Sequence, residues 1–526
     1  MFKHLKRDFP ASIVVFFVAL PLCLGIALAS GAPLFSGLIA GIIGGIVVGS
    51  ISGSQVGVSG PAAGLAVIVL GAIASLGSFE NFLVAVIIGG AIQIFLGIAK
   101  AGVIGYYFPT SVIKGMLAGI GIIIFIKQIP FALGLSDDVA FSEYVTDDHI
   151  AYGEYFNTLF DNISIGVVII TAISLGIIIL WSNVLEKKAK IFKLVPGPVV
   201  AVVVGVLFYV LVPEGSIFGI SAHNLVSVPV PENASDFISQ FSFPNFSIIT
   251  NSEVWIVGIT IAIVASLETL LSVEATDKID PERRITPTNR ELFAQGVGNI
   301  VSGFIGGLPI TQVVVRSSAN IDSNNKTKLS AILHGFLLLI SIIIIPRILN
   351  LIPLGVLAAV LFVVGYKLAK PSLFKDMFKL GKSQFVPFTI TVIGIVFTDL
   401  LIGIGLGLAS GLLTVLYNSY KNSHFLHIKE TDSDKKYINM TLAEEVTFFN
   451  KGAILRELKN IEKDSLVEID ITKTQSLDYD ILEILDDYAF KAKENNIDIK
   501  LIHRKGEVEN PKSFKQYFDE IIASDK

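Results

Sequence analysis

QVGVSGPAAG, at residues 55–64, is the stretch that decides the fold, because Gly57, Gly60 and Pro61 interrupt an otherwise apolar span. Proline has no backbone N–H to donate, so it is disfavoured inside a helix, but it suits the first helical turn. We therefore expect a helix to begin near Pro61. The break that precedes this helix should lie within the depth of a membrane.

A second stretch has the same character. GGLPITQVVVRSSAN occupies residues 306–320, and its glycines and Pro309 again precede a short apolar stretch. Glycine and proline are more frequent in membrane helices than in soluble ones, which would explain either break alone. Two breaks at corresponding positions in the two halves of a chain mark the binding site of many transporters. The sequence favours this second interpretation.

Composition places both breaks in a membrane protein. The 526-residue chain is 52% hydrophobic, its mean hydropathy is +0.70, and only 16% of its residues are charged. Soluble chains average about 25% charged residues. A bilayer core of about 30 Å needs roughly 20 apolar residues in a helix. The sequence predicts fourteen segments, near residues 11–30, 34–51, 61–77, 81–99, 110–130, 162–182, 196–213, 254–273, 290–306, 310–320, 329–346, 351–366, 385–398 and 400–418.

The breaks fall in the third segment of each set of seven, which predicts an inverted repeat. Helix N-termini carry free N–H groups and partial positive charge, so two of them facing one another would favour an anion. The predicted anion-binding residues are Gly60, Pro61, Ala62, Ala63, Thr311, Gln312, Val313 and Arg316. Arg316 would add a permanent positive charge, although an arginine near a span end can also extend to the membrane surface.

Glu268 lies deep in the eighth segment, where an ionisable group costs roughly 2.5–3.5 kcal/mol at a helix centre. Ser272 is four residues further on, so both share one helix face. With the unwound carbonyls at Gly307 and Pro309, this face is predicted to bind Na⁺, or Glu268 carries H⁺. A structural hydrogen bond from Glu268 to a neighbouring helix is the alternative.

Lysine and arginine in loops set the orientation of a membrane protein, since they are retained on the inner side. The N-terminus and segments 183–193, 277–290 and 367–382 are basic, whereas segments 136–161 and 214–252 contain no Lys or Arg. We expect a multi-pass protein of the plasma membrane with both termini cytoplasmic. Residues 1–423 would form the transmembrane domain.

The chain changes character after residue 423. Strands near 436–449, 465–471 and 497–503 alternate with helices near 452–463, 479–495 and 512–523, which predicts a cytoplasmic α/β domain over residues 424–526. The sequence shows no nucleotide-binding loop, metal-ligand spacing or nucleophile arrangement. We expect no enzyme activity, no cofactor beyond Na⁺ as a coupling ion, and no nucleic-acid partner.

These motifs resemble the SulP (sulfate permease) family of anion transporters. ALPLCLGIALASGAP at residues 19–33, QVGVSGPAAG, ASLETLLSVEATDK at 265–278 and the stretch from Asn289 to Asn320 carry the resemblance. It implies an all-α domain of seven plus seven inverted spans, with segments 1–4 and 8–11 as the core and the others as the gate. It also implies that Arg316 binds the anion and that Glu268 and Ser272 bind the coupling ion.

The resemblance further implies a homodimer and a C-terminal STAS domain with a possible cytoplasmic partner. Two departures stand out. Cys23 follows Pro21-Leu22 where many members have a polar glutamine after the proline, and QSLDYD at residues 475–480 lacks the Asp-Ser of phosphorylated STAS proteins. Thr472 and Thr474 remain candidate phosphorylation sites.

Together these features predict secondary active transport of a small inorganic oxyanion, bicarbonate or sulfate, coupled to Na⁺ or H⁺ by alternating access. One fixed full positive charge favours bicarbonate slightly. An anion exchanger or channel, a nucleobase–proton symporter and a sensor or scaffold whose tail binds a partner are the alternatives. Lipid is an obligatory neighbour in every case.

Overall fold

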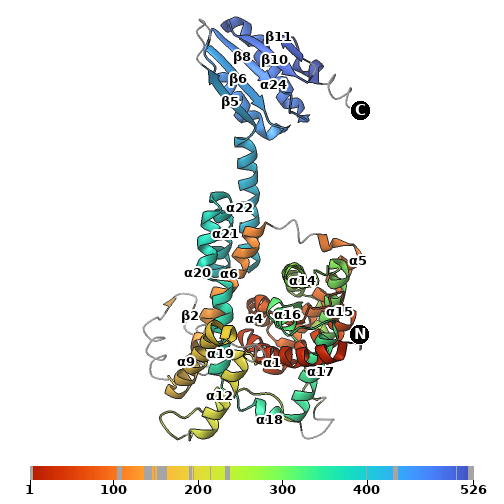
Figure 1. Ribbon diagram of the computed structural model, residues 1–526, viewed down its shortest axis with the longest axis vertical. Helices are drawn as coiled ribbons and strands as arrows, with labels where there is room; N and C mark the ends of the chain where they lie inside the picture. Colours follow the sequence, from red (N-terminus) through yellow and green to blue (C-terminus); the bar gives the residue numbers. More distant parts are fainter. Residues whose placement is uncertain are drawn as a thin grey trace. The chain divides into compact units, whose positions relative to one another are not determined.

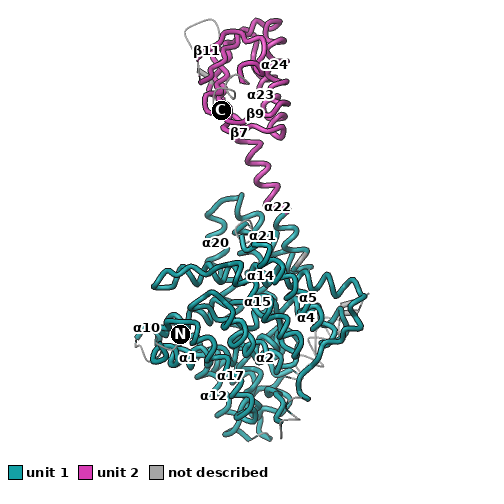
Figure 2. The backbone as a smooth tube through the Cα atoms, turned by 90° about the vertical axis from the view of Figure 1, so that its right-hand side faces the viewer, with its two compact units in different colours: residues 1–408 teal, residues 409–526 magenta. Residues whose placement is uncertain are grey.

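The computed structural model describes residues 4–103, 109–135, 145–146, 149–150, 163–188, 192, 195–213, 215–231, 237, 239–398, 400–429, 436–504 and 506–518. Within them the chain divides into two compact units, residues 1–408 and 409–526, which Figure 2 shows in separate colours. The first unit is almost entirely helical. The second contains a β-sheet.

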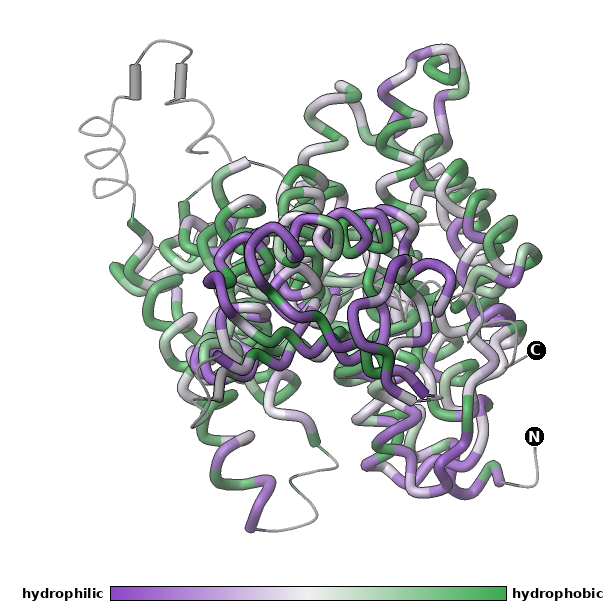
Figure 3. Tube along the Cα trace, turned by 90° about the horizontal axis from the view of Figure 1, so that it is seen from above, coloured by the Kyte–Doolittle hydropathy of each residue, from purple (hydrophilic) through white to green (hydrophobic). Residues whose placement is uncertain are grey.

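Each of the fourteen predicted segments corresponds to a helical stretch. Eight helices are long and apolar enough to cross a membrane within the described chain, and Figure 3 shows hydrophobic residues along most helices of the first unit. The stretches are α1 (Leu5–Ala29), α2 (Leu34–Ile43) continued by η2 (Gly44–Val48) and α3 (Gly49–Ile51), η3 (Ala63–Leu65) with α4 (Ala66–Leu76), α5 (Phe79–Ile98), α6 (Thr110–Lys127), α9 (Ile165–Leu180), α12 (Gly197–Leu211), α14 (Ser252–Ile279), α15 (Thr288–Phe304), α16 (Val314–Asp322), α17 (Leu329–Ile344), α19 (Leu354–Leu368), α21 (Lys382–Phe397) and α22 (Leu400–Lys421).

Shorter elements connect these helices. They are α7 (Ile129–Leu133), β2 (Val145–Thr146), β3 (His149–Ile150), η7 (Trp181–Leu185), α10 (Glu186–Lys188), η8 (Ala222–Asn224), η9 (Phe246–Thr250), α18 (Pro346–Leu349) and α20 (Pro371–Lys379). The predicted acidic loop at 136–161 lies almost wholly outside the described residues.

Helix packing sorts the first unit into two bundles. In one, α5 packs against α14 and α15, and α1 packs against α2, α16 and α17; in the other, α6 packs against α19 and α21, and α9 against α12 and α19. Figure 1 shows the first bundle toward the right and the second toward the left. This division matches the core and the gate that the family resemblance implies. The predicted architecture of seven plus seven spans is confirmed.

The second unit is a small α/β fold. Its five-stranded sheet has the order β11-β10-β8-β6-β5, in which β6, β8 and β10 are parallel and both edge strands are antiparallel. Its elements are β5 (His424–Lys429), β6 (Lys436–Leu442), β7 (Glu445–Val446), η10 (Phe448–Asn450), α23 (Lys451–Lys459), β8 (Ser465–Asp470), β9 (Ser476–Leu477), α24 (Tyr479–Ala492), η11 (Lys493–Asn495), β10 (Asp498–His503) and β11 (Gly506–Glu509). The expected alternation of strands and helices is present. The two edge strands, β5 and β11, were not among the strands expected from the sequence.

Candidate functional site

The two breaks lie side by side as a short antiparallel ribbon. Strand β1 (Ser59–Pro61) pairs with β4 (Ile310–Gln312), so that Gly60 lies opposite Thr311 and Pro61 opposite Ile310. Every residue of both strands is buried. Extended backbone at membrane depth must find its hydrogen-bond partners inside the protein, and each break supplies them to the other.

Because the ribbon forms, both half-helices begin later than the sequence suggested. The first begins at Ala63 and the second at Val314, each after the paired strand. Pro61 was expected in a first helical turn, but it lies at the end of strand β1. Ala62 is extended and precedes the first half-helix. Because the ribbon is antiparallel, η3 follows the Pro61 end of it and α16 follows the Gln312 end.

Several backbone amides near the second break already have protein acceptors. Ile310 donates to Asn299 Oδ1, Gln312 donates to Thr269 Oγ1 at 3.4 Å, and Val313 donates to the Val58 carbonyl at 2.9 Å. The Gln312 and Val313 amides, which were expected to face an anion, are thus engaged in holding the ribbon.

Arg316 is fully buried, with an exposed fraction of 0%. None of its three guanidinium nitrogens has a hydrogen-bond partner among the described residues. A β-carbon placed on Gly60 would lie 2.1 Å from Nη1, so the guanidinium packs directly on the ribbon backbone. The Cys23 thiol of α1 also interacts with it. This burial excludes an arginine that extends to the membrane surface.

Glu268 belongs to α14, and its carboxyl group lies beside the start of the first half-helix. A β-carbon on Gly64 would be 2.7 Å and 2.8 Å from the two carboxylate oxygens, and the Gly64 amide interacts with the carboxylate. Oε2 is buried and has no hydrogen-bond partner within the described residues. Ser272, one turn further along α14, is buried as well. The carboxyl group of Glu268 therefore lies beside the first residues of the first half-helix, where a negative charge would be favoured.

Gly307 and Pro309, the other two residues predicted to bind the coupling ion, lie just before β4. The Gly307 amide donates to the Ser302 carbonyl at 2.7 Å, and a β-carbon there would lie 2.2 Å from Ser302 Oγ and 2.8 Å from Ile39. Both residues are buried, and the contacts given for Gly307 lie on α2 and α15.

A buried amide network braces the ribbon, and the sequence did not point to it. Asn299 bonds both the N–H and the C=O of Ile310 and donates to Gln93 Oε1, while Gln295 donates to Ser59 Oγ at 2.8 Å and to Glu291. All are buried. The available signal was the presence of glutamine and asparagine inside apolar spans, because such groups are costly without partners.

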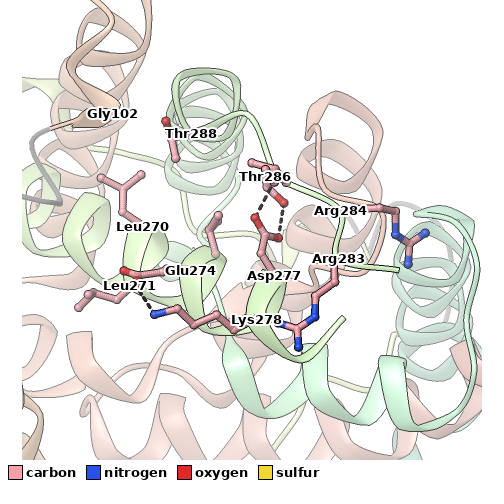
Figure 4. A pocket seen from close by; sticks show the side chains of 12 residues that line it. Gly102, Leu270, Leu271, Glu274, Asp277, Lys278, Arg283, Arg284, Thr286 and Thr288 are labelled. Atoms are coloured by element: carbon pink, nitrogen blue, oxygen red, sulfur yellow. Dashed lines mark hydrogen bonds and ion pairs between the residues drawn. The ribbon is translucent and has the colours of Figure 1, made fainter. Parts of the chain in front are cut away.

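An open cavity of about 290 Å³ lies at the C-terminal end of α14. Figure 4 shows Lys278 paired with Glu274, and Asp277 accepting from the Thr286 amide and hydroxyl. Beyond it, hydrogen bonds from Arg284 lower the pKa of Asp280 below its usual range. No residue of β1 or β4 lines this cavity, so we do not assign the anion to it.

The structure combines a buried ribbon that leads into two half-helices with two buried ionisable groups, the Arg316 guanidinium near Gly60 and the Glu268 carboxyl near Gly64. This arrangement defines a polytopic membrane transporter of the broken-helix class. The chain belongs to the sulfate permease family, whose sequence pattern matches residues 5–391. The expected family is confirmed, and with it an anion transporter that is not an enzyme.

Known relatives agree with this family. The chain is 27% identical over 412 residues to a Bacillus subtilis protein, YvdB, whose name describes it as a candidate sulfate transporter; the match covers 77% of this chain and 72% of that protein. It is also 27% identical over 426 residues to the bicarbonate transporter BicA of a Picosynechococcus species, covering 79% and 71%. A solved structure of the murine anion transporter Slc26a9 in its inward-facing state is similar in fold, with a TM-score of 0.74 and 15% identity over 95% of this chain and 86% of that one.

Proposed function

We propose that this protein takes up a small inorganic oxyanion by secondary active transport, using Na⁺ or H⁺ as the coupling ion and alternating access between its two bundles. The observation that carries the proposal is the Arg316 guanidinium, which is fully buried, packs on the paired breaks and has no hydrogen-bond partner in the described part of the chain. Buried charges in native proteins are paired or bind an ion. The ion that would pair with a buried guanidinium is an anion.

Glu268 supports the coupling step. Moving one charge against 100 mV costs about 2.3 kcal/mol, which a monovalent anion entering a negative cell must overcome. Cotransport with one cation cancels this cost. The carboxylate lies on α14, and α14 contacts β4, α16 and η3, so the coupling group and both half-helices belong to one bundle. An ion at Glu268 would move together with the anion.

The experiment is uptake of labelled bicarbonate and labelled sulfate into proteoliposomes under imposed Na⁺ or H⁺ gradients. Glu268→Gln should abolish dependence on the cation gradient, whereas Glu274→Gln on the same helix is the matched control, since Glu274 is half exposed and paired with Lys278. Arg316→Ala should weaken both anions, with Arg347→Ala, an exposed arginine, as its control. Gradient-dependent uptake by Glu268→Gln would remove the coupling assignment.

A channel or an exchanger is the second possibility within the same family. Steady anion currents without a cation gradient would favour a channel, and uptake that requires a trapped anion inside the vesicle would favour an exchanger. The same vesicles report all three outcomes.

We also infer that both termini face the cytoplasm of a plasma-membrane protein that forms homodimers. The basic residues between α14 and α15, and those between α19 and α21, support the orientation through the inner location of positive loops. The STAS-like unit would then meet any cytoplasmic partner.

A further inference from the structure

His334 is a buried polar residue for which the proposed transport mechanism has no role so far. It lies on α17, its exposed fraction is 0%, and its Nδ1 is 2.8 Å from the Ala331 carbonyl. Its other ring nitrogen, Nε2, is buried without a hydrogen-bond partner among the described residues. A buried nitrogen without a hydrogen-bond partner costs folding free energy, so such groups in native proteins often bind a water, an ion or a ligand.

The contact to Ala331 fixes the form of the ring. A carbonyl oxygen only accepts, so Nδ1 must carry the proton that it shares with this oxygen. A proton on Nε2 as well would make the ring a buried cation, and Nε2 has no hydrogen-bond partner among the described residues. A buried charge without a partner is costly. The ring is therefore neutral, and Nε2 presents a lone pair that accepts a hydrogen bond.

The face of α17 that carries His334 is turned toward the anion site. A β-carbon on Gly41 would lie 2.9 Å from Leu338, one turn after His334, and 4.0 Å from Arg316 Nη1. On the same face of α17, one turn before His334, Ala331 packs with Val58, two residues before Gly60. Cys23 from α1 also approaches Gly41, so Arg316, Cys23 and the face of α17 that carries His334 meet near this residue. Of the side chains of Arg316, Cys23 and His334, that of Arg316 is permanently charged.

Among the described residues, three donor nitrogens of Arg316 and one acceptor nitrogen of His334 lack hydrogen-bond partners, and together they complement a particular kind of ligand. We propose that His334 is a specificity-determining residue, whose Nε2 accepts the hydroxyl proton of a singly protonated oxyanion while Arg316 binds its charged oxygens. This inference rests on the proposed function. Bicarbonate has one hydroxyl donor and two charged acceptor oxygens. Sulfate and nitrate have only acceptors at neutral pH, so they leave Nε2 unpaired.

Bicarbonate and nitrate form a matched pair of test anions, because both are planar and carry one negative charge, and only bicarbonate has a proton to donate. The half-saturating concentration of each is measured in the full-length protein, from uptake of labelled bicarbonate and from its inhibition by nitrate. His334→Leu should weaken bicarbonate roughly tenfold and leave nitrate within about twofold. His334→Gln keeps an acceptor in the side chain and should retain most of the preference. Arg316→Ala should weaken both anions together.

The outcomes separate this inference from the proposed function. If His334→Leu weakens bicarbonate and nitrate equally, or neither of them, the specificity role of His334 is overturned. If the wild-type protein takes up neither bicarbonate nor sulfate, the proposed function itself fails. Recovery from the membrane and melting temperature control for folding. If the leucine variant is not recovered, His334→Met removes the same acceptor with a flexible side chain that adapts to the available space.

Discussion

Replacing Gly44 with alanine tests whether the position of the ribbon sets the anion site. Gly44 opens the π-helical turn η2, and a β-carbon there would lie 2.4 Å from the Ser59 carbonyl oxygen and 2.8 Å from the Gly60 nitrogen. Non-bonded heavy atoms settle at about 3.5–4.0 Å. Since both neighbours are backbone atoms, either η2 or the ribbon must move by about 1 Å. Forcing an extra methyl into a packed core typically costs about 1–3 kcal/mol.

The displacement should affect transport more than stability. Gly60 packs on the Arg316 guanidinium, so moving it by about 1 Å changes the shape of the site at its charged centre. A misplacement of this size costs on the order of 100-fold where reacting groups must be aligned, and we expect uptake to fall by about 10- to 100-fold. Gly71→Ala is the control, because a β-carbon at that position would meet no described atom within 4 Å apart from its own helix backbone and chain neighbours.

The assay is the initial rate of labelled bicarbonate uptake per reconstituted protein, with melting temperature measured on the same preparations. Gly44→Ala should melt a few degrees lower and transport far more slowly, whereas Gly71→Ala should match the wild type in both. Wild-type transport by Gly44→Ala would refute the reasoning, because it would show that the ribbon moves freely without consequence. Equal losses in both variants would point to poor insertion instead.

Two further predictions follow from single contacts. Gly64→Ala places a methyl 2.7–2.9 Å from the Glu268 carboxylate. We expect the half-saturating cation concentration for uptake to rise about tenfold, while the anion affinity stays unchanged. A weaker anion affinity at an unchanged cation requirement would show instead that Glu268 serves the anion. Asp280→Asn removes an acceptor whose pKa is lowered by Arg284. Because the folded pKa lies below the unfolded value of about 3.9, the stabilisation of about 2 kcal/mol is present at neutral pH and is lost as pH falls through the folded pKa. Melting at pH 7 should therefore separate the variant from wild type, and the gap should close on acidification; an equal gap at both pH values would contradict this.

The membrane segments and the two breaks followed from the sequence because the bilayer constrains them locally. A helix that crosses hydrocarbon needs a long apolar run, and glycine or proline within that run disturbs the backbone wherever the chain goes. The helix starts were misplaced by two to four residues. Pairing with the other break competes with helix formation at residues 59–61 and 310–312, and sequence patterns around one break contain no information about the other.

The residues around the site divide in the same way. Arg316 and Glu268 could be found because charges are rare in apolar spans. The roles of Gln295 and Asn299 could not, since an amide acquires meaning only from the partner it reaches, here Ser59 and the Ile310 backbone. His334 shows the limit most clearly, because a single histidine on an apolar helix is equally consistent with a packed core residue and with a binding-site residue.

The sequence by itself determined that this chain lies in a membrane, how many segments it has, where two of them break and which charges lie within them, because each of these depends on local composition and on the thickness of the bilayer. Only the tertiary structure decided that the two breaks, some 250 residues apart, pair with each other, that Arg316 is buried against Gly60 and not at the surface, and that Glu268 faces Gly64. These contacts join helices that are distant in the chain, and packing between whole bundles fixes which side chains meet.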